Sequence, residues 1–446
     1  MIKKKAVILL SAAALLASCA DVPDNVRNKP EGQDSEVAVG SGVTVDRLLE
    51  GAEDVSAYIK EKGYGAKFVL ESDVHIDLPE QLYELETETV SEAQLKFPEV
   101  YSKLFGRDFY EDSGVKDFSE LMHYSEHINE HGYFFDDWST MGSSIIYAGG
   151  DCEPPEYTMY LDVSTGGFLF FRDERYDTAG SLAEIINAGS LPLPDREYTF
   201  KNGEKCSLKA LAENTEKKFN EVLGSFTDQY SYRAGMIYPY TAEDGTCWMY
   251  IDMERCYKGV PFCNHIIVDQ LYGVPEPKKN YPVEGRMQYA PIYIAEVDEP
   301  DHIFDIDCPN GIDKVISETE LSGGLVSLPQ ALDIMNNELS PKIELHISDI
   351  RLCYMCDYDS ADVEAALKVR ETTNYQDMTK EQQALIGNPT LIPGRRYRAY
   401  PVWEFRLDRR LRDKDGFFLQ REACDMITVD VRTGELNTYF DCISQR

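Results

Sequence analysis

Residues 160–171 read YLDVSTGGFLFF, and residues 428–439 read TVDVRTGELNTY. Each stretch places the pattern Asp-Val-x-Thr-Gly between two arms in which apolar and polar residues alternate. Alternation is typical of a half-buried β-strand, and the glycine provides a turn that lets the second strand fold back on the first. Each stretch therefore predicts an antiparallel hairpin. The shared pattern has two explanations, a repeated ancestral unit or independent use of a common turn.

The chain around these hairpins predicts further helices and strands. Two helices have clear ends: one begins after Ser207 and stops at Gly224, and another begins at the capping box of Ser327. Other helices are expected at 45–62, 91–105, 114–131 and 180–188. Strands are expected at 66–78, 143–148, 156–172, 230–240, 246–257, 286–297, 343–358, 396–407 and 425–440. This order predicts an α+β fold in which antiparallel sheets are each packed against one or two helices.

Composition and loop signals divide the chain into five segments. They are an export signal at 1–18, a disordered tether at 19–43, an N-terminal α+β domain at 44–197, an α+β unit at 198–317 and a C-terminal α+β unit at 318–446. The tether is polar and contains Pro, Gly, Asp and Asn. It cannot bury enough apolar surface to offset the ordering of its backbone.

The first 19 residues, MIKKKAVILLSAAALLASC, have the features of a lipoprotein signal peptide. Lys3–Lys5 give a positive start, and the apolar run Ala6–Leu16 is shorter than the about 20 residues that span a bilayer. The run ends in a lipobox, Leu-Ala-Ser-Cys, whose Cys19 thiol accepts a lipid. The sequence therefore predicts a lipid anchor at Cys19 and a location on the extracytoplasmic face of the cell membrane. The alternative is an ordinary secretory signal with a chance cysteine.

The chain is strongly acidic, with a formal net charge of −35 at pH 7. A negative field of this size repels nucleic acid and anionic lipid headgroups, so no nucleic-acid partner is expected. The same field favours cations or basic partners, although solubility alone is the simpler explanation. Because 43% of the residues are apolar and 28 are tyrosines, the chain has enough apolar side chains to form hydrophobic cores.

The order of a helix, strands and a terminal strand with the Asp-Val-x-Thr-Gly turn resembles the PepSY-like family of small extracytoplasmic domains. The residues that carry this resemblance are 327–339, 343–358, 398–405 and 427–436, and segment 207–262 is similar to a preceding repeat. Segments 73–79 and 104–106 also resemble a family of uncharacterised lipoproteins of Gram-positive bacteria. The resemblance implies PepSY-like units at 198–317 and 318–446. It implies binding or regulation outside the membrane and no catalytic residues.

The sharpest catalytic candidate is the segment 123–127, HYSEH, which matches the inverted zinc-protease pattern H-x-x-E-H. On a helix, His123, His127 and His131 would share one face and could hold zinc, while Glu126 activated a water. The apolar stripe of the expected helix lies on its opposite side, so these histidines are expected to face solvent. Histidines near a helix C-terminus also complement its dipole without a further role. We therefore expect no metal site here. The less favoured hypothesis is a metal site whose candidate residues are His123, Glu126, His127 and His131.

Of the 11 cysteines, Cys19 is assigned to the lipid, which leaves an even number. Outside the cytoplasm this number permits disulfides without requiring them. Cys353 and Cys356 have the CxxC spacing of metal and redox sites. On the alternating strand expected there, these two positions point to opposite faces, so the thiols cannot hold one ion.

The remaining motifs favour no particular reaction. The strand around Trp403 alternates aromatic residues with arginines, and Pro401 predicts an edge or a bulge, where a peptide could add a strand. Core packing is the simpler interpretation. There is no G-x-S-x-G, P-loop or dinucleotide-binding motif, and no cofactor is expected. The leading hypothesis is a non-enzymatic lipoprotein that binds a protein, peptide or envelope ligand. The alternatives are a zinc-dependent hydrolase and a structural envelope component.

Overall fold

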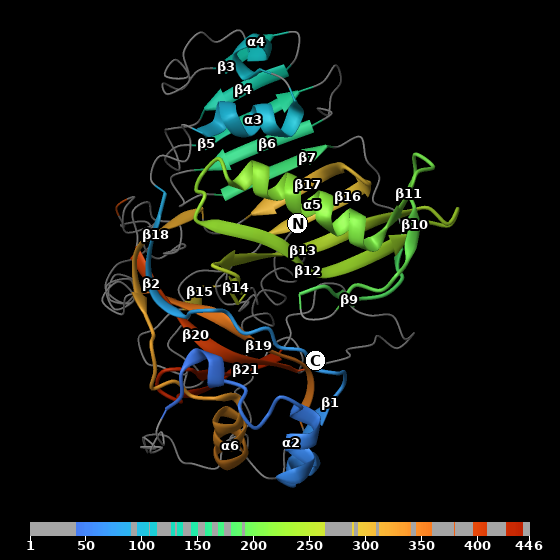
Figure 1. Cartoon of the computed structure of the whole chain (residues 1–446). Helices are drawn as coiled ribbons and strands as arrows, with labels where there is room; N and C mark the ends of the chain where they lie inside the picture. The colour runs from blue at the N-terminus through green and yellow to red at the C-terminus, as the bar shows by residue number, and fades with distance from the viewer. Residues whose placement is uncertain are drawn as a thin grey trace, which may run out of the picture.

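The computed structural model describes residues 42–90, 96–106, 108–113, 126–129, 132–136, 144–149, 157–162, 168–173, 180–189, 192–263, 288–289, 293–308, 312–339, 345–358, 379, 396–407 and 425–439. Nearly all the strands among these residues belong to two large β-sheets, which Figure 1 shows one above the other. A separate two-stranded ribbon consists of β10 (Glu197–Thr199) and β11 (Lys205–Ser207).

The lower sheet in Figure 1 has eight strands. Its main path is β1 (Phe68–Leu70), β19 (Leu345–Tyr358), β20 (Arg396–Leu407), β2 (Tyr83–Thr89) and β18 (Asp313–Glu320). Three more strands extend it: β15 (Gln288–Tyr289) pairs with β19, β21 (Asp425–Asp430) pairs with β20, and β22 (Leu436–Tyr439) pairs with β21. The pair of β1 and β19 is parallel and the others are antiparallel, so the sheet is mixed.

The upper sheet has twelve strands. Its main path is β3 (Glu126–Asn129), β4 (Gly132–Asp136), β5 (Ser144–Gly149), β6 (Tyr157–Asp162), β7 (Phe168–Asp173), β17 (His302–Cys308), β16 (Ile294–Glu299), β13 (Cys247–Tyr257), β12 (Tyr230–Thr241) and β8 (Ser181–Leu182). Strand β9 (Ile186–Asn187) pairs with β12, and β14 (Val260–Pro261) pairs with β13.

Few helices accompany these sheets. The elements are η1 (Val45–Arg47), α2 (Val55–Glu61), η2 (Tyr64–Ala66), α3 (Phe97–Phe105), α4 (Phe109–Ser113), α5 (Leu208–Leu223) and α6 (Leu328–Glu338). In Figure 1, α3 and α5 lie across the upper sheet, and α2 and α6 lie below the lower one. Within the described part of the chain, no helix combines the length and the apolar character needed to cross a bilayer.

The two helices with the clearest sequence signals are confirmed. Ser207 caps α5 by accepting a hydrogen bond from the amide of Ala210, and α5 ends at Gly224. Ser327 and Gln330 form the reciprocal bonds of a capping box at the start of α6. These ends were predictable because a cap depends on residues three positions apart, whatever the rest of the chain does.

Both predicted hairpins are present, and they lie in different sheets. Strands β6 and β7 form the first, with Asp162 opposite Phe168 in the upper sheet. Strands β21 and β22 form the second in the lower sheet. In the second turn, Gly434 has a φ of 75°, a conformation that glycine adopts without strain.

The predicted fold class is wrong. The described residues form two large sheets with few helices, and this arrangement does not fit helix-packed PepSY-like units at 198–317 and 318–446. The expected order of local elements was largely right, but strands far apart in the sequence pair with one another. Strand β20 pairs with β2, and β7 pairs with β17, so the sheets cross the expected boundaries at 197 and 317. Similarly, the helix expected at 180–188 is replaced by β8 and β9, because both pair with β12.

Pro401 predicted an edge or a bulge, and strand β20 is not at an edge of its sheet. It pairs with β19 along one side, and with β2 and then β21 along the other. The partner changes between Ala399, which faces Leu85, and Val402, which faces Asp430. Pro401 lies at this change, where a backbone donor is not needed, and its carbonyl accepts from the amide of Val431. A proline is thus tolerated in a central strand, and strand addition at this position is excluded.

Alternating rows of side chains give the lower sheet two different faces. One row runs across four paired strands through Leu352, Trp403, Val429 and Leu436, and it belongs to the main apolar core together with residues of α6. The neighbouring row, Arg351, Glu404, Thr428 and Asn437, is polar and buried. Because successive residues point to opposite faces, the polar row lies on the side away from α6.

Candidate functional site

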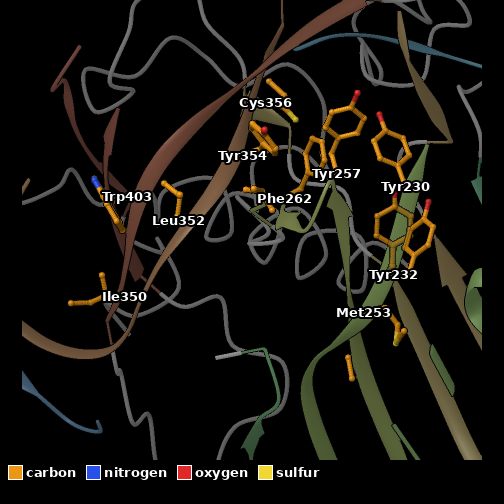
Figure 2. Close-up of a cluster of buried hydrophobic side chains, with 14 of the residues drawn as sticks. Tyr230, Tyr232, Met253, Tyr257, Phe262, Ile350, Leu352, Tyr354, Cys356 and Trp403 are labelled. Carbon is orange, nitrogen blue, oxygen red and sulfur yellow. The ribbon is translucent and has the colours of Figure 1, made fainter. Parts of the chain in front are cut away.

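The two sheets meet where the chain leaves β14 and runs beside β19. The residue after β14, Phe262, forms a parallel bridge to Tyr354, and the amide of Cys263 donates to the carbonyl of Tyr354 at 2.8 Å. The ring centroids of Phe262 and Tyr354 are 5.3 Å apart. Figure 2 shows these rings, with those of Tyr257 and Tyr230, between the strands of the two sheets. Backbone hydrogen bonds and aromatic packing therefore join the sheets directly.

Two consecutive residues of β13 each form a buried ion pair with the lower sheet. Glu254 pairs with Arg351 of β19, and Arg255 pairs with Asp313 of β18. Successive residues of a strand point to opposite faces, so the pairs lie on opposite sides of β13. We call these residues and their charged partners the inter-sheet seam: Arg233, Glu254, Arg255, Asp313, Arg351, Glu404 and Arg406.

On one side of the seam, acids and arginines alternate. Glu254 accepts a hydrogen bond from Arg351 and another, at 3.2 Å, from Arg233 Nε. Arg351 Nε also donates to Glu404 at 2.6 Å, and Arg406 Nε donates to the other Glu404 oxygen at 3.0 Å. Burial alone would raise the pKa of Glu254, but the surrounding arginines outweigh burial and hold this pKa below its ordinary value. Glu254 is therefore ionised at neutral pH.

On the other side, a guanidinium and two phenols enclose Asp313. Arg255 and the hydroxyl of Tyr397 both donate to Oδ2, and the hydroxyl of Tyr230 donates to Oδ1 at 2.6 Å. The guanidinium carbon of Arg255 also lies 4.1 Å from the ring centroid of Phe262, a cation–π contact. Burial raises the pKa of Asp313, and Arg255 opposes this rise only in part.

Beside Glu404 lies a group of sulfur atoms. We call Cys263, Cys353, Glu404 and Met426 the thiol cluster. Sulfur and carboxylate atoms of Cys263, Cys353 and Glu404 all lie within 4.8 Å of one another. The Cys353 thiol donates to Glu404 Oε2 at 3.2 Å, and Cys263 Sγ lies 3.6 Å from Met426 Sδ. All four residues are buried, and burial is the main cause that raises the pKa of Cys353 well above its ordinary value. Cys353 is therefore a neutral thiol at neutral pH.

Two glycines provide the space that Glu254 occupies. Gly235 lies at a bulge between Ala234 and Met236, where the pairing of β12 with β13 shifts. A Cβ on Gly235 would lie 2.5 Å from Glu254 Cγ, and a Cβ on Gly189 would lie 3.0 Å from a carboxylate oxygen. A larger residue at Gly235 would therefore push the carboxylate out of the seam.

The predicted histidine helix is wrong where the structure describes it. We expected a helix over 114–131, but Glu126–Asn129 form strand β3, which pairs with β4. Sheet pairing overrides the helical period, and the spacing that would place histidines four residues apart on one helical face does not apply within this strand. His127 is thus on a strand next to Glu126. His123 and His131 lie outside the described residues, and so does Cys19.

The described cysteines are all free thiols. The prediction for the CxxC pair is confirmed, because Cys353 and Cys356 face opposite sides of β19 and belong to different apolar clusters. The thiol that lies near Cys353 is instead that of Cys263, which follows strand β14 of the upper sheet. The expectation that disulfides are permitted is untested for the cysteines outside the described residues.

Sequence reasoning missed the seam and the thiol cluster. Their members come from β12, β13, β18, β19, β20, β21 and the end of β14, and no short motif connects them. One signal was present: Glu254 and Arg255 stand inside the apolar strand sequence 247–257. A charge within a buried strand requires a partner, so this dipeptide alone predicts cross-sheet ion pairs without naming them.

Comparisons with known proteins give no family. No protein-family model matches the sequence, and no curated protein matches it. One similar solved structure is that of an uncharacterized protein from Eubacterium rectale, with 11% sequence identity and a TM-score of 0.42. The match covers 84% of this chain and 91% of that chain. A likeness at this level carries no argument about function.

Proposed function

We propose that this protein is a lipid-anchored, extracytoplasmic binding protein without catalytic activity of its own. The observation that carries the proposal is the leader that ends in the lipobox 16–19. A short apolar run after three lysines directs export, and a cysteine at its end is the acceptor for a diacylglyceryl group. The anchored protein would face a partner in the cell envelope.

Three features support a binding role. The polar segment 20–43 would lift the folded part off the lipid surface. The described fold begins at the end of this segment, where Val43 pairs with Leu325, and buried ion pairs join its two sheets. The net charge of −35 attracts cationic groups, so a basic protein or peptide is the partner that the electrostatics favour.

The anchor is tested by comparing the wild-type chain with Cys19→Ser in the native bacterium. We expect the wild-type protein in the membrane fraction, resistant to high salt and released only by detergent. Cys19→Ser should keep the leader and lose the lipid, so metabolic labelling with a fatty acid should vanish. Equal labelling of both proteins would contradict the anchor.

The binding role is tested by cross-linking in intact cells, followed by purification under denaturing conditions. A specific partner should appear as a defined, saturable cross-linked species with the anchored protein. Added salt before cross-linking should weaken it, because screening reduces charge attraction. The absence of any such species would favour a purely structural envelope component.

A further inference from the structure

We propose that the thiol cluster binds one Zn²⁺ ion, with Cys263 and Cys353 as thiolate ligands and Glu404 and Met426 completing the set. This site lies inside the fold and is independent of the proposed partner binding. Cys263 and Cys353 belong to opposite sides of the junction between the sheets. A bound ion would therefore tie the end of β14 to β19, β20 and β21.

Two of the six donor–donor distances of a tetrahedral zinc site can be compared with the structure. With Zn–S bonds of about 2.3 Å and Zn–O bonds of about 2.0 Å, neighbouring donors lie roughly 3.5–3.8 Å apart. In the structure, Cys353 Sγ lies 3.2 Å from Glu404 Oε2, and Cys263 Sγ lies 3.6 Å from Met426 Sδ. These two edges are therefore close to those of the required tetrahedron, and the donor atoms of Cys263, Cys353 and Glu404 lie within 4.8 Å of one another. Shifts of a few tenths of an ångström along these two edges would suit an ion.

The surrounding side chains orient the carboxylate ligand. Arg351 Nε and Arg406 Nε donate to different oxygens of Glu404, so the carboxylate is ionised and fixed. A carboxylate has about four lone-pair positions, so Oε2 can accept from Arg351 and still bind an ion. Hydrogen bonds of this kind, from groups that do not touch the metal, commonly hold metal-binding carboxylates in place.

Charge balance favours a divalent ion. Binding breaks the S–H bonds of Cys263 and Cys353, forms two S–Zn bonds and releases two protons to solvent, with no change of oxidation state. The net charge of the buried site is then unchanged. A cuprous ion with the same two thiolates would leave one uncompensated negative charge, which is costly in a buried place. Zinc is also a thiophilic ion that accepts mixed sulfur and oxygen ligands.

The test uses the full chain, purified in detergent, unfolded with reductant and chelator, and refolded with Zn²⁺ or with Cu⁺. Native mass spectrometry and elemental analysis then measure the bound metal. We expect one zinc per wild-type chain and none in Cys353→Ser. The matched control is Cys356→Ser, which changes another buried cysteine of the same strand on its opposite face and should keep the zinc. His127→Ala should keep it as well.

Two further measurements cover variants that fail to fold. Cobalt bound to the wild-type protein should give thiolate-to-cobalt charge-transfer absorption, which only thiolate ligands produce. Met426→Leu conserves volume and should weaken zinc binding roughly tenfold or more. The proposal is overturned if folded wild-type protein takes up no zinc, or if Cys353→Ser retains it. A protein that binds copper but not zinc, or that forms a disulfide between Cys263 and Cys353 in place of metal uptake, would overturn it too.

Discussion

Replacing Glu254 by glutamine removes one charge from the centre of the inter-sheet seam and keeps the shape of the side chain. The carboxylate faces Arg351, itself buried, and no solvent can replace it. Removing one partner of a buried pair costs about 3–5 kcal/mol when a buried charge is left uncompensated. In Glu254→Gln, the buried guanidinium groups of Arg351 and Arg406 would share Glu404 as their ion-pair partner, which leaves an excess of buried positive charge. The free energy of unfolding should therefore fall by about 3–5 kcal/mol in Glu254→Gln.

This loss converts into a measurable shift of the melting temperature. An unfolding entropy of about 2.1 cal/mol/K per residue gives the 428 residues that follow the 18-residue leader of this 446-residue chain (446 − 18 = 428) a slope of roughly 0.9 kcal/mol per degree. We expect the Tm at neutral pH to fall by about 3–5 °C, measured by thermal unfolding with circular dichroism.

The matched control is Glu50→Gln, which breaks an ion pair with Arg47 on the surface. Both side chains of this pair are more than half exposed, at 57% and 55%, and exposed pairs contribute at most about 1 kcal/mol. In protein that already carries Glu254→Gln, Arg351→Met should lower the free energy of unfolding by less than it does in the wild type. Both substitutions break the same ion pair, so its loss is counted only once. If Glu254→Gln unfolded within one degree of the wild type, the seam would not hold the sheets together.

Three further outcomes follow from the same contacts. Gly235→Ala should lower the free energy of unfolding by about 1–3 kcal/mol in urea titrations, since the new Cβ would overlap Glu254, whereas Gly323→Ala, with only ordinary contacts, should cost less. Ser327→Ala should cost about 1 kcal/mol in the same assay, because α6 loses its cap. The depressed pKa of Glu254 contributes stability that is present above its unfolded pKa and is lost as the pH falls through its folded pKa. Urea midpoints measured below about pH 4 should therefore fall more steeply in the wild type than in Glu254→Gln.

Local signals in the sequence predicted the local structure. The caps at Ser207 and Ser327 and the turn at Gly434 depend on residues two to four positions apart, so they survive in any tertiary context. The arrangement of the sheets depends instead on which distant strands pair. Pro401 illustrates the difference: its missing donor is harmless because the partner strand changes beside it, and no local pattern reports that change.

The thiol cluster could not be predicted from the sequence, because its residues come from segments that are far apart along the chain. In the sequence, the near neighbour of Cys353 is Cys356, and strand periodicity correctly predicts that these two thiols face opposite sides and cannot hold one ion. Its actual neighbour, Cys263, comes from another sheet, and Met426 comes from a third region of the chain. The zinc pattern at 123–127 was visible in the sequence because its residues are adjacent. The helix that it assumed is not formed at Glu126 and His127, the described part of that segment, which belong to a strand.

The most direct test of the account is the mass of the mature N-terminus, taken from native membranes after proteolysis. The proposal requires cleavage between Ser18 and Cys19 and a diacylglyceryl thioether on that sulfur. A peptide that begins with lipidated cysteine would agree with this. A retained leader, or an unmodified thiol at the start of the mature chain, would contradict the anchor and the envelope role that depends on it.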